Sequence, residues 1–257
     1  MAVRVGVSAP QQHVDFDDWR RACVAAEEAG VDFIANWDHF YPLSGEPEGK
    51  HYECLSLLAA LAAITERAEI GPLVLCNTYR NPNLVADMAR TIDHISGGRF
   101  VLGVGAGWFE KDYDEYGYEF GTPGGRARAL AASLLVIKER LARLNPAPLR
   151  RIPILIGAKG EKVMLRIVAE HADIWHSSGT PEEIRHKCEV IDGWCREVER
   201  NPAEIERSVF VDGPIPEQDP DELLAAGATF MITRLAPPYD LGRARELVAW
   251  RDRINAA

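Results

Sequence analysis

Two stretches of the sequence decide the fold: Glu28–Ile34, which reads EAGVDFI, and Ala225–Met231, which reads AAGATFM. Each joins the end of a helical pattern to the start of a β-rich run through a single glycine, Gly30 or Gly227. Glycine most readily adopts the left-handed conformation that ends a helix. The same helix-to-strand step is therefore indicated near both ends of the chain.

Short β-rich runs recur along the whole chain, and helical periodicity follows each of them. Most of the runs are continuously apolar, as strands covered on both faces must be. Eight runs qualify: Val3–Ser8, Phe33–Asn36, Ile70–Cys76, Phe100–Gly105, Pro153–Ile156, Asp173–His176, Val209–Asp212 and Phe230–Thr233.

The segments between the runs have the spacing of amphipathic helices. Apolar residues recur every three or four positions over Leu130–Leu144 and over Ile184–Val198, so each set shares one helix face. The start signals agree. Thr180–Glu183 has the pattern of a capping box with proline at the first helical position, and Asp219–Glu222 repeats it with aspartate.

Eight strand–helix units without a break in composition predict an α/β fold, a (β/α)₈ TIM barrel that forms one domain over residues 1–257. The alternative, a doubly wound open sheet, is disfavoured because no GxGxxG turn follows the first strand. At 257 residues, 47% of them hydrophobic, the chain can bury one sizeable core. The active site of such a barrel lies at the carboxyl ends of its strands.

Charge and cysteine content restrict the partners. Lys and Arg total 29 against 39 Asp and Glu, a net charge of -10, which argues against nucleic acid or an anionic membrane as the main partner. The five cysteines form no CxxC pair, so neither a zinc site nor a redox pair is indicated. We find no signal peptide and no apolar run that could span a membrane, and expect a cytoplasmic protein with reduced thiols.

The second run ends in Asn36–Phe40, which brings a carboxylate, an imidazole and two aromatic rings to the catalytic face. The imidazole of His39 can give or take a proton near neutral pH, because its unperturbed pKa is roughly 6.5. The alternative is a packed histidine beside Asp38, with the aspartate capping a turn. Spacing alone does not decide between the two.

The residues that end the third and fourth runs fit either a ligand site or an ordinary structural role. Arg80 could hold an anion and Tyr79 could line a ring-shaped ligand, although Cys76–Pro82 also has the composition of a surface loop. Gly103–Trp108 carries glycine at alternate positions, which removes side chains from one face. Either a flat ligand approaches the backbone there, or the barrel packs tightly at that point.

The fifth and sixth runs both end in turns that lead into a helix. Ile156–Gly160 and Ser177–Thr180 would present backbone N–H groups at the positive end of a helix dipole, and Lys159 adds a charge. A phosphate is the ligand that two such turns favour, although either alone is ordinary turn chemistry. We predict no metal site, since the spacing of His171, Asp173 and His176 matches none. Glu110–Glu115 is interpreted as a solvated loop.

Taken together, these segments resemble the bacterial luciferase-like superfamily, and within it the oxidoreductases that use the deazaflavin coenzyme F-420. The resemblance implies a TIM barrel with the cofactor at the carboxyl ends of the strands, a small-molecule substrate and a homodimer. The matching stretches cover nearly the whole chain in order: Trp37–Phe40, Ser56–Thr65, Tyr79–Pro82, Asp93–Phe100, Gly103–Trp108, Pro153–Gly160 and Ala169–Asp173.

The resemblance also implies roles for individual residues. His39 would be the catalytic acid/base, and a cis peptide bond between Leu73 and Val74 would lie under the cofactor ring. The expected substrate pocket consists of Trp37, Tyr79, Arg80 and Trp108. The expected cofactor-binding residues are Asp38, Leu73, Val74, Gly105, Ala106, Gly107, Gly157, Ala158, Lys159, Gly160, Ser177, Ser178, Gly179 and Thr180.

Two departures from the family pattern affect the expected function. Trp108 stands where sugar-phosphate dehydrogenases of the family carry a glutamate proton donor, which argues against that substrate. The connection between the fourth and fifth strands is shorter than in many members, so we expect a more open site or one that a partner subunit completes. The expected reaction is hydride transfer between coenzyme F-420 and a small organic substrate. The alternatives are an FMN-dependent luciferase-like monooxygenase and a non-catalytic flavin-binding barrel.

Overall fold

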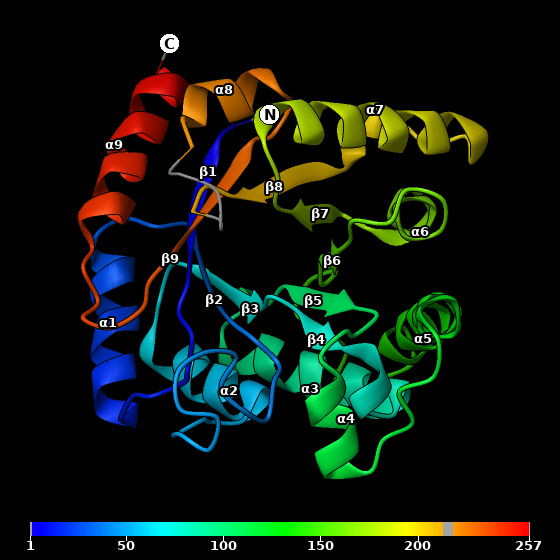
Figure 1. The fold of residues 1–257 in the computed structure, drawn as a ribbon, viewed down its shortest axis with the longest axis horizontal. Helices are drawn as coiled ribbons and strands as arrows, with labels where there is room; N and C mark the ends of the chain where they lie inside the picture. Colours follow the sequence, from blue (N-terminus) through cyan, green and yellow to red (C-terminus); the bar gives the residue numbers. More distant parts are fainter. Residues whose placement is uncertain (1, 213–217, 257) are drawn as a thin grey trace.

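Parallel strands form the centre of the molecule, and helices lie around them (Figure 1). The computed structural model describes residues 2–212 and 218–256. The strands pair in the order β3-β2-β1-β9-β8-β7-β6-β5-β4. Their bounds are β1 (Arg4–Ser8), β2 (Phe33–Asn36), β3 (Glu69–Pro72), β4 (Leu75–Cys76), β5 (Leu102–Gly105), β6 (Ile154–Gly157), β7 (Ile174–Ser177), β8 (Glu206–Phe210) and β9 (Phe230–Arg234).

The two ends of this order, β3 and β4, are consecutive pieces of one strand. Only Leu73 and Val74 separate them, and the peptide bond between these two residues is cis, as the resemblance implied. The Ile70 amide also donates to the Arg99 carbonyl at 3.0 Å, and the Val101 amide donates to the Ile70 carbonyl at 2.9 Å. The sheet therefore closes on itself, and the predicted TIM barrel is confirmed.

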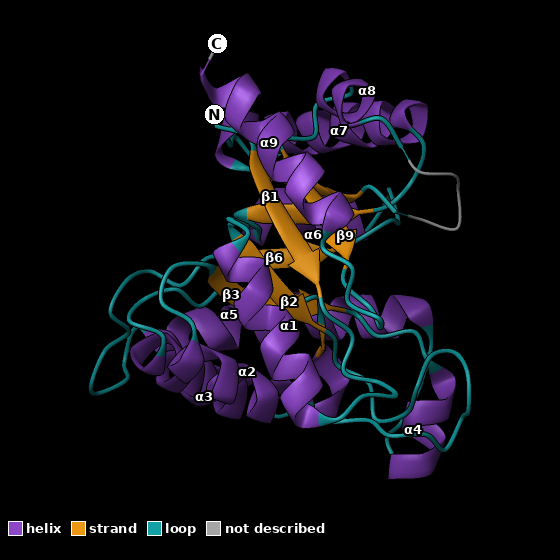
Figure 2. Ribbon diagram, turned by 90° about the vertical axis from the view of Figure 1, so that its left-hand side faces the viewer, coloured by secondary structure: helices purple, strands orange, loops and turns teal. Residues whose placement is uncertain are grey.

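The helices cover the outside of the barrel, as the purple and orange elements of Figure 2 show. The apolar faces predicted from the sequence are buried, including Leu130, Leu134 and Ile137 of one helix and Ile184 of another. The bounds are α1 (Phe16–Glu28), α2 (Cys54–Ile64), α3 (Pro82–Ile95), α4 (Glu110–Tyr116), α5 (Pro123–Leu141), α6 (Met164–His171), α7 (Pro181–Glu197), α8 (Pro220–Ala225) and α9 (Gly242–Ala256), with 3₁₀ turns at Asn77–Tyr79 and Pro202–Glu204.

Two sequence interpretations were wrong. The strand expected at Val209–Asp212 is β8, which begins at Glu206. Its charged residues conceal it, because Glu206 bonds Arg4 inside the barrel. The run expected to be a solvated loop is the helix α4, in which Asp112 is fully buried. A helix at this place brings a carboxylate inward, where the sequence had suggested only surface charge.

The barrel is filled at its base and middle, which leaves only the carboxyl ends of the strands open. At the base, the Arg4 guanidinium bonds Glu69 at 2.5 Å and Glu206 at 2.8 Å. Above this cluster, the side chains of a separate interior group pack together: Phe33, Ala35, Val101, Leu155, Ile174, Phe230 and Ile232. Among the described residues, the interior is therefore open to a ligand at the end of the barrel at which the strands finish.

The glycines of Gly103–Trp108 are required by packing. A Cβ at Gly103 would lie 1.9 Å from the Pro72 carbonyl oxygen, and one at Gly107 would lie 2.0 Å from the Tyr113 hydroxyl. Gly107 also has a φ of 85°, a conformation that L side chains rarely adopt. Of the two alternatives left open by the sequence, tight packing explains both positions.

The capping box at the start of α7 is confirmed and gives a first prediction. The Thr180 hydroxyl accepts from the Glu183 amide, and the Glu183 carboxylate accepts from the Thr180 amide. We expect Thr180→Ala to lower the free energy of unfolding by about 1 kcal/mol, and Thr180→Ser to retain most of it, because serine keeps the accepting oxygen. Thermal unfolding of both variants checks this, and equal losses for the two would contradict it.

Candidate active site

A cavity of about 610 Å³ lies at the carboxyl ends of the strands. Most of the predicted site residues line it: Trp37, Asp38, His39, Leu73, Val74, Tyr79, Gly105, Ala106, Gly107, Trp108, Gly157, Ala158, Lys159, Ser177 and Ser178. Arg80, Gly160, Gly179 and Thr180 are not among its lining residues. Segments that are far apart in the sequence thus meet in one cavity.

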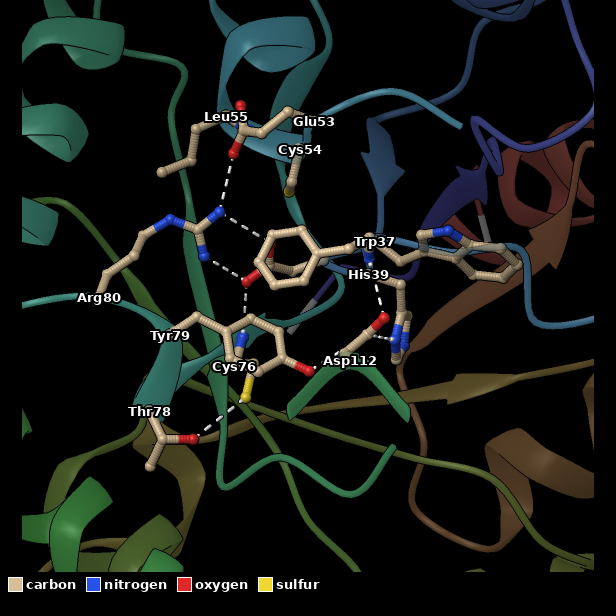
Figure 3. Close-up of polar contacts among 12 residues, drawn as sticks. Trp37, His39, Glu53, Cys54, Leu55, Cys76, Thr78, Tyr79, Arg80 and Asp112 are labelled. Atoms are coloured by element: carbon tan, nitrogen blue, oxygen red, sulfur yellow. Dashed lines mark hydrogen bonds and ion pairs between the residues drawn. The ribbon is translucent and has the colours of Figure 1, made fainter. Parts of the chain in front are cut away.

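His39 is held by a carboxylate that the sequence analysis did not select. Its Nδ1 lies 2.7 Å from an oxygen of Asp112, which comes from α4 (Figure 3). The same carboxylate accepts from the Phe40 amide at 3.2 Å and from the Tyr79 hydroxyl at 3.1 Å. A carboxylate only accepts, so Nδ1 carries a proton. In its neutral form the His39 ring therefore offers the lone pair of Nε2 to a ligand.

Aromatic rings surround His39. The centroids of the Trp37, Trp108 and Phe109 rings lie 6.0, 5.7 and 5.4 Å from that of the imidazole, each in an edge-to-face arrangement. The Trp37 indole donates to Nε2 of His51 at 3.1 Å. Burial lowers the pKa of His51 to about 4, with the neighbouring His39 adding to this effect. His51 is thus a neutral acceptor near pH 7, and it fixes one wall of the site.

Arg80 lies in a different place from the one predicted. Its guanidinium makes two hydrogen bonds to Asp38, at 2.5 and 2.9 Å, and a third to Glu53 at 2.7 Å, the last visible in Figure 3. Burial raises the pKa of the Asp38 carboxyl, and the guanidinium and the Cys76 amide oppose that rise. Arg80 therefore neutralises a buried carboxylate beside the cavity, since its donors are directed at protein side chains.

The two predicted phosphate turns differ in what they offer. After β6, Gly157, Ala158 and Lys159 reach the cavity. After β7, only Ser177 and Ser178 do so, because the Thr180 amide is already bonded to Glu183. A Cβ added to Gly179 would lie 2.6 Å from a carboxylate oxygen of Glu183, which keeps an anion away from that part of the turn. The turn after β6 is the better anion site.

Two cations face the cavity without a carboxylate partner. Lys159 and Arg234 line it, and within residues 2–212 and 218–256 neither forms an ion pair. Arg234 ends β9 and was not selected from the sequence. The rule that strand ends carry the site could have found it and Ser8, but Leu43 and Met164 lie outside the strands and carried no such signal.

His171, Asp173 and His176 do not converge on a common point. Asp173 pairs with Arg151 at 2.6 Å, whereas Nδ1 of His176 lies 3.0 Å from the Ser208 hydroxyl. In the part of the chain that the structure describes, no group of three or more His, Cys, Asp or Glu side chains is placed to hold a metal ion. None of its helices is long and apolar enough to cross a bilayer.

Fold and site together define a class of protein: a parallel barrel with a cavity for a small ligand at the carboxyl ends of its strands. At this cavity the His39–Asp112 pair lies beside glycine-bearing turns. The model of the luciferase-like monooxygenase family matches residues 2–249. The chain belongs to this family.

Two curated proteins are similar to this chain in sequence. The chain is 30% identical over 179 residues to an F-420-dependent glucose-6-phosphate dehydrogenase of Amycolatopsis mediterranei, a match over 63% of this chain and 53% of that protein. It is 28% identical over 190 residues to the pyrimidine monooxygenase RutA of Allorhizobium ampelinum, over 66% and 51%. The chain thus spans about half the length of both relatives.

The structural match is more complete. An F-420-dependent secondary alcohol dehydrogenase, solved with an F-420–acetone adduct, superimposes with a TM-score of 0.83 over 96% of this chain and 98% of that one. The two sequences are 16% identical. At this identity the match shows a shared fold.

Proposed function

We propose that this protein is an oxidoreductase that transfers a hydride between the deazaflavin coenzyme F-420 and a small organic substrate. The observation that carries the proposal is the joint placement of His39, Asp38 and the two turns around one cavity. Two relatives of this fold or family carry F-420 in their names, which supports the choice of coenzyme.

The residues of the cavity fit such a coenzyme. Leu73, Val74 and Leu75 give an apolar surface at the cis peptide bond, and Gly105 of β5 and Gly157 of β6 leave room for the Val74 side chain. A Cβ on Gly105 or Gly157 would lie 2.8 or 3.1 Å from Val74. A flat ring can lie on this surface, while Lys159 and Arg234 are placed to attract the phosphate-bearing tail.

A deazaflavin or flavin supplies the hydride chemistry when it is bound. The protein positions the substrate and manages the proton. Asp112 holds the neutral His39 ring in the tautomer with a lone pair on Nε2, so this atom can take a proton from a substrate hydroxyl. In the opposite direction, the protonated ring returns the proton to a carbonyl oxygen from the same atom. Trp37, Trp108 and Phe109 limit the access of water to that transfer.

The walls of the site also indicate the class of substrate. The Trp108 side chain is 64% exposed, so much of its indole is available to a ligand beside His39. An apolar surface at this place favours a neutral organic molecule, such as an alcohol or ketone, over a sugar phosphate. A homodimer, implied by the family resemblance, belongs to the proposal and can be measured by light scattering.

A titration distinguishes the two candidate cofactors. We expect F-420 to bind with a lower dissociation constant than FMN. Lys159 and Arg234, the two cations that line the cavity, would attract the longer acidic tail of F-420. Fluorescence of each compound, titrated with purified protein in buffer of fixed ionic strength, gives both constants. Tighter binding of FMN would instead favour the alternative of an FMN-dependent monooxygenase; the family description and RutA both name a monooxygenase.

The second alternative function, a barrel that binds a flavin without catalysis, predicts a different result. If that hypothesis is right, F-420 or FMN binds, but no coenzyme turnover is found with a panel of secondary alcohols and ketones. Turnover of any panel member above the rate of a His39→Ala control supports the proposed oxidoreductase.

A further inference from the structure

Two buried polar atoms at the end of β7 have no hydrogen-bond partner in the protein. They are Nε2 of His176 and the hydroxyl of Ser177, whose residues are 7% and 4% exposed. Both residues line the cavity. Leaving such atoms unpaired costs roughly 1–3 kcal/mol each, so buried polar groups normally have partners. A ligand in the cavity is the partner available to Nε2 of His176.

The His176 ring faces the interior of the barrel. Along β7, Ile174 belongs to the interior cluster and Trp175 to the outer one, so the next residue points inward again. In register, His176 lies between Gly157 of β6 and Ser208 of β8. Its ring also meets Phe210 edge-on, with 4.7 Å between the centroids. The imidazole is thus fixed on three sides, and only Nε2 lacks a partner.

The partner of Nδ1 determines which nitrogen carries the proton. The Ser208 hydroxyl lies 3.0 Å from Nδ1, in a residue with no exposed surface. Among the described residues this is the only hydrogen bond found for the hydroxyl. A buried hydroxyl must donate its proton somewhere, so it donates to Nδ1. The neutral ring therefore carries its proton on Nε2 and acts as a donor toward the cavity.

The charge of the ring restricts what it can bind. Burial, together with the charge of Lys159, lowers the pKa of His176 to about 3, so the ring is neutral throughout the physiological range. A neutral donor inside the barrel suits an uncharged oxygen. The phosphate-bearing end of a ligand would instead be attracted to Lys159 and Arg234.

We propose that His176 donates a hydrogen bond from Nε2 to a hydroxyl of the polyhydroxy chain that links the ring of the bound cofactor to its phosphate. This inference rests on the proposed function only for the identity of the ligand. His176 lies between the expected places of the ring and of the phosphate. It is on the strand next to Gly157, where an added Cβ would contact Val74 under the ring, and it comes two residues before Ser178 at the turn.

The experiment compares ligands that do and do not contain this chain. Dissociation constants of riboflavin and lumiflavin, the ring without the polyhydroxy chain, are measured by fluorescence for the wild type, His176→Phe and His176→Gln. We expect His176→Phe to weaken riboflavin binding about 10-fold and to leave lumiflavin within about 2-fold. His176→Gln, which retains an N–H donor, should restore most of the riboflavin affinity. His171→Gln, a histidine outside the cavity, should change neither constant.

Equal effects of His176→Phe on both ligands would overturn the proposal, because the contact would then involve the ring or the general structure. Failure of the wild type to bind any of riboflavin, FMN and F-420 would overturn the proposed function, and this inference with it. Binding of all three without any effect of His176→Phe would overturn this inference alone.

A measurement on the wild type keeps the test independent of variant folding. Long-range proton–nitrogen NMR spectra of ¹⁵N-histidine-labelled protein report the tautomer of each ring. We expect His176 to carry its proton on Nε2, to show no titration between pH 5 and pH 9, and to shift when riboflavin is added. A proton on Nδ1, or a midpoint near pH 6, would contradict the assignment.

Discussion

Replacing Arg80 with methionine is expected to lower the free energy of unfolding by roughly 3–5 kcal/mol, the usual cost of removing one partner of a buried ion pair. The side chains of Arg80 and Asp38 are 11% and 1% exposed, so water cannot replace the two hydrogen bonds that Asp38 loses. For a chain of this length, the melting temperature should fall by roughly 6–20 °C. Thermal unfolding followed by circular dichroism measures it.

The matched control is Arg143→Met. Arg143 follows the end of α5 and pairs on the surface with Glu139 of that helix, with side chains 72% and 61% exposed, and we expect its loss to cost less than about 1 kcal/mol. The double variant Arg80→Met/Asp38→Asn should recover part of the stability, because no unpaired buried carboxylate remains. Equal melting temperatures for Arg80→Met and Arg143→Met would show that the buried pair contributes little.

The pH dependence of this destabilisation has a definite sign. Burial already raises the pKa of Asp38, and removal of Arg80 raises it further above the unfolded value of roughly 3.9. The folded variant then binds the proton more tightly than the unfolded chain does. Its stability deficit should shrink as the pH falls through the raised pKa, and grow again as the pH rises. A deficit that does not change with pH would mean that Asp38 is not the origin of the loss.

Replacing His39 with alanine is expected to lower kcat about 100-fold or more, since a positioned acid/base group contributes roughly 10²–10⁴-fold. Turnover is followed as the change in F-420 absorbance with the secondary alcohol or ketone that the panel identifies. The dissociation constant of F-420 should stay within about 3-fold, because the apolar surface and the rim cations are unchanged. His94→Ala, which removes a partly exposed histidine of α3 outside the cavity, serves as the control and should retain full turnover.

Asp112→Asn tests the same assignment from the other side of the ring. An amide nitrogen can donate to Nδ1 and so place the proton on Nε2, which removes the lone pair needed for proton transfer. We expect kcat to fall at least 10-fold with little change in coenzyme affinity. A variant of either residue with unchanged kcat would remove His39 from the proposed mechanism.

The candidate site was only partly predictable from the sequence. Sequence position shows which residues end a strand, but it does not show which side chains from other elements contact them. Trp37, Asp38 and His39 follow β2 directly, and the rule for barrel strand ends placed them in the cavity. Asp112 lies within a run of charged residues that is typical of a solvated loop. Nothing local distinguishes its carboxylate from that of Asp114, and only the packing of α4 against the barrel does.

Arg80 and His176 illustrate the same limit for hydrogen bonding. From the sequence, Arg80 appeared free to bind an anion, whereas its fixed fork of donors is taken up by Asp38 and Glu53. His176 appeared only as an unconvincing metal ligand. Its neutral state and its unpaired nitrogen result from burial between Gly157 of β6 and Ser208 of β8, residues distant in sequence that only strand pairing brings beside it.

The sequence by itself determined the alternation of strands and helices, the caps at Gly30, Gly227 and Thr180, and the class of cavity at the strand ends. Those features depend on local periodicity and backbone conformation, which neighbouring residues specify. The tertiary structure alone decided which polar groups are paired and which are left to bind a ligand. That outcome depends on contacts between residues distant in sequence, and on the burial that shifts the pKa of Asp38 and His176.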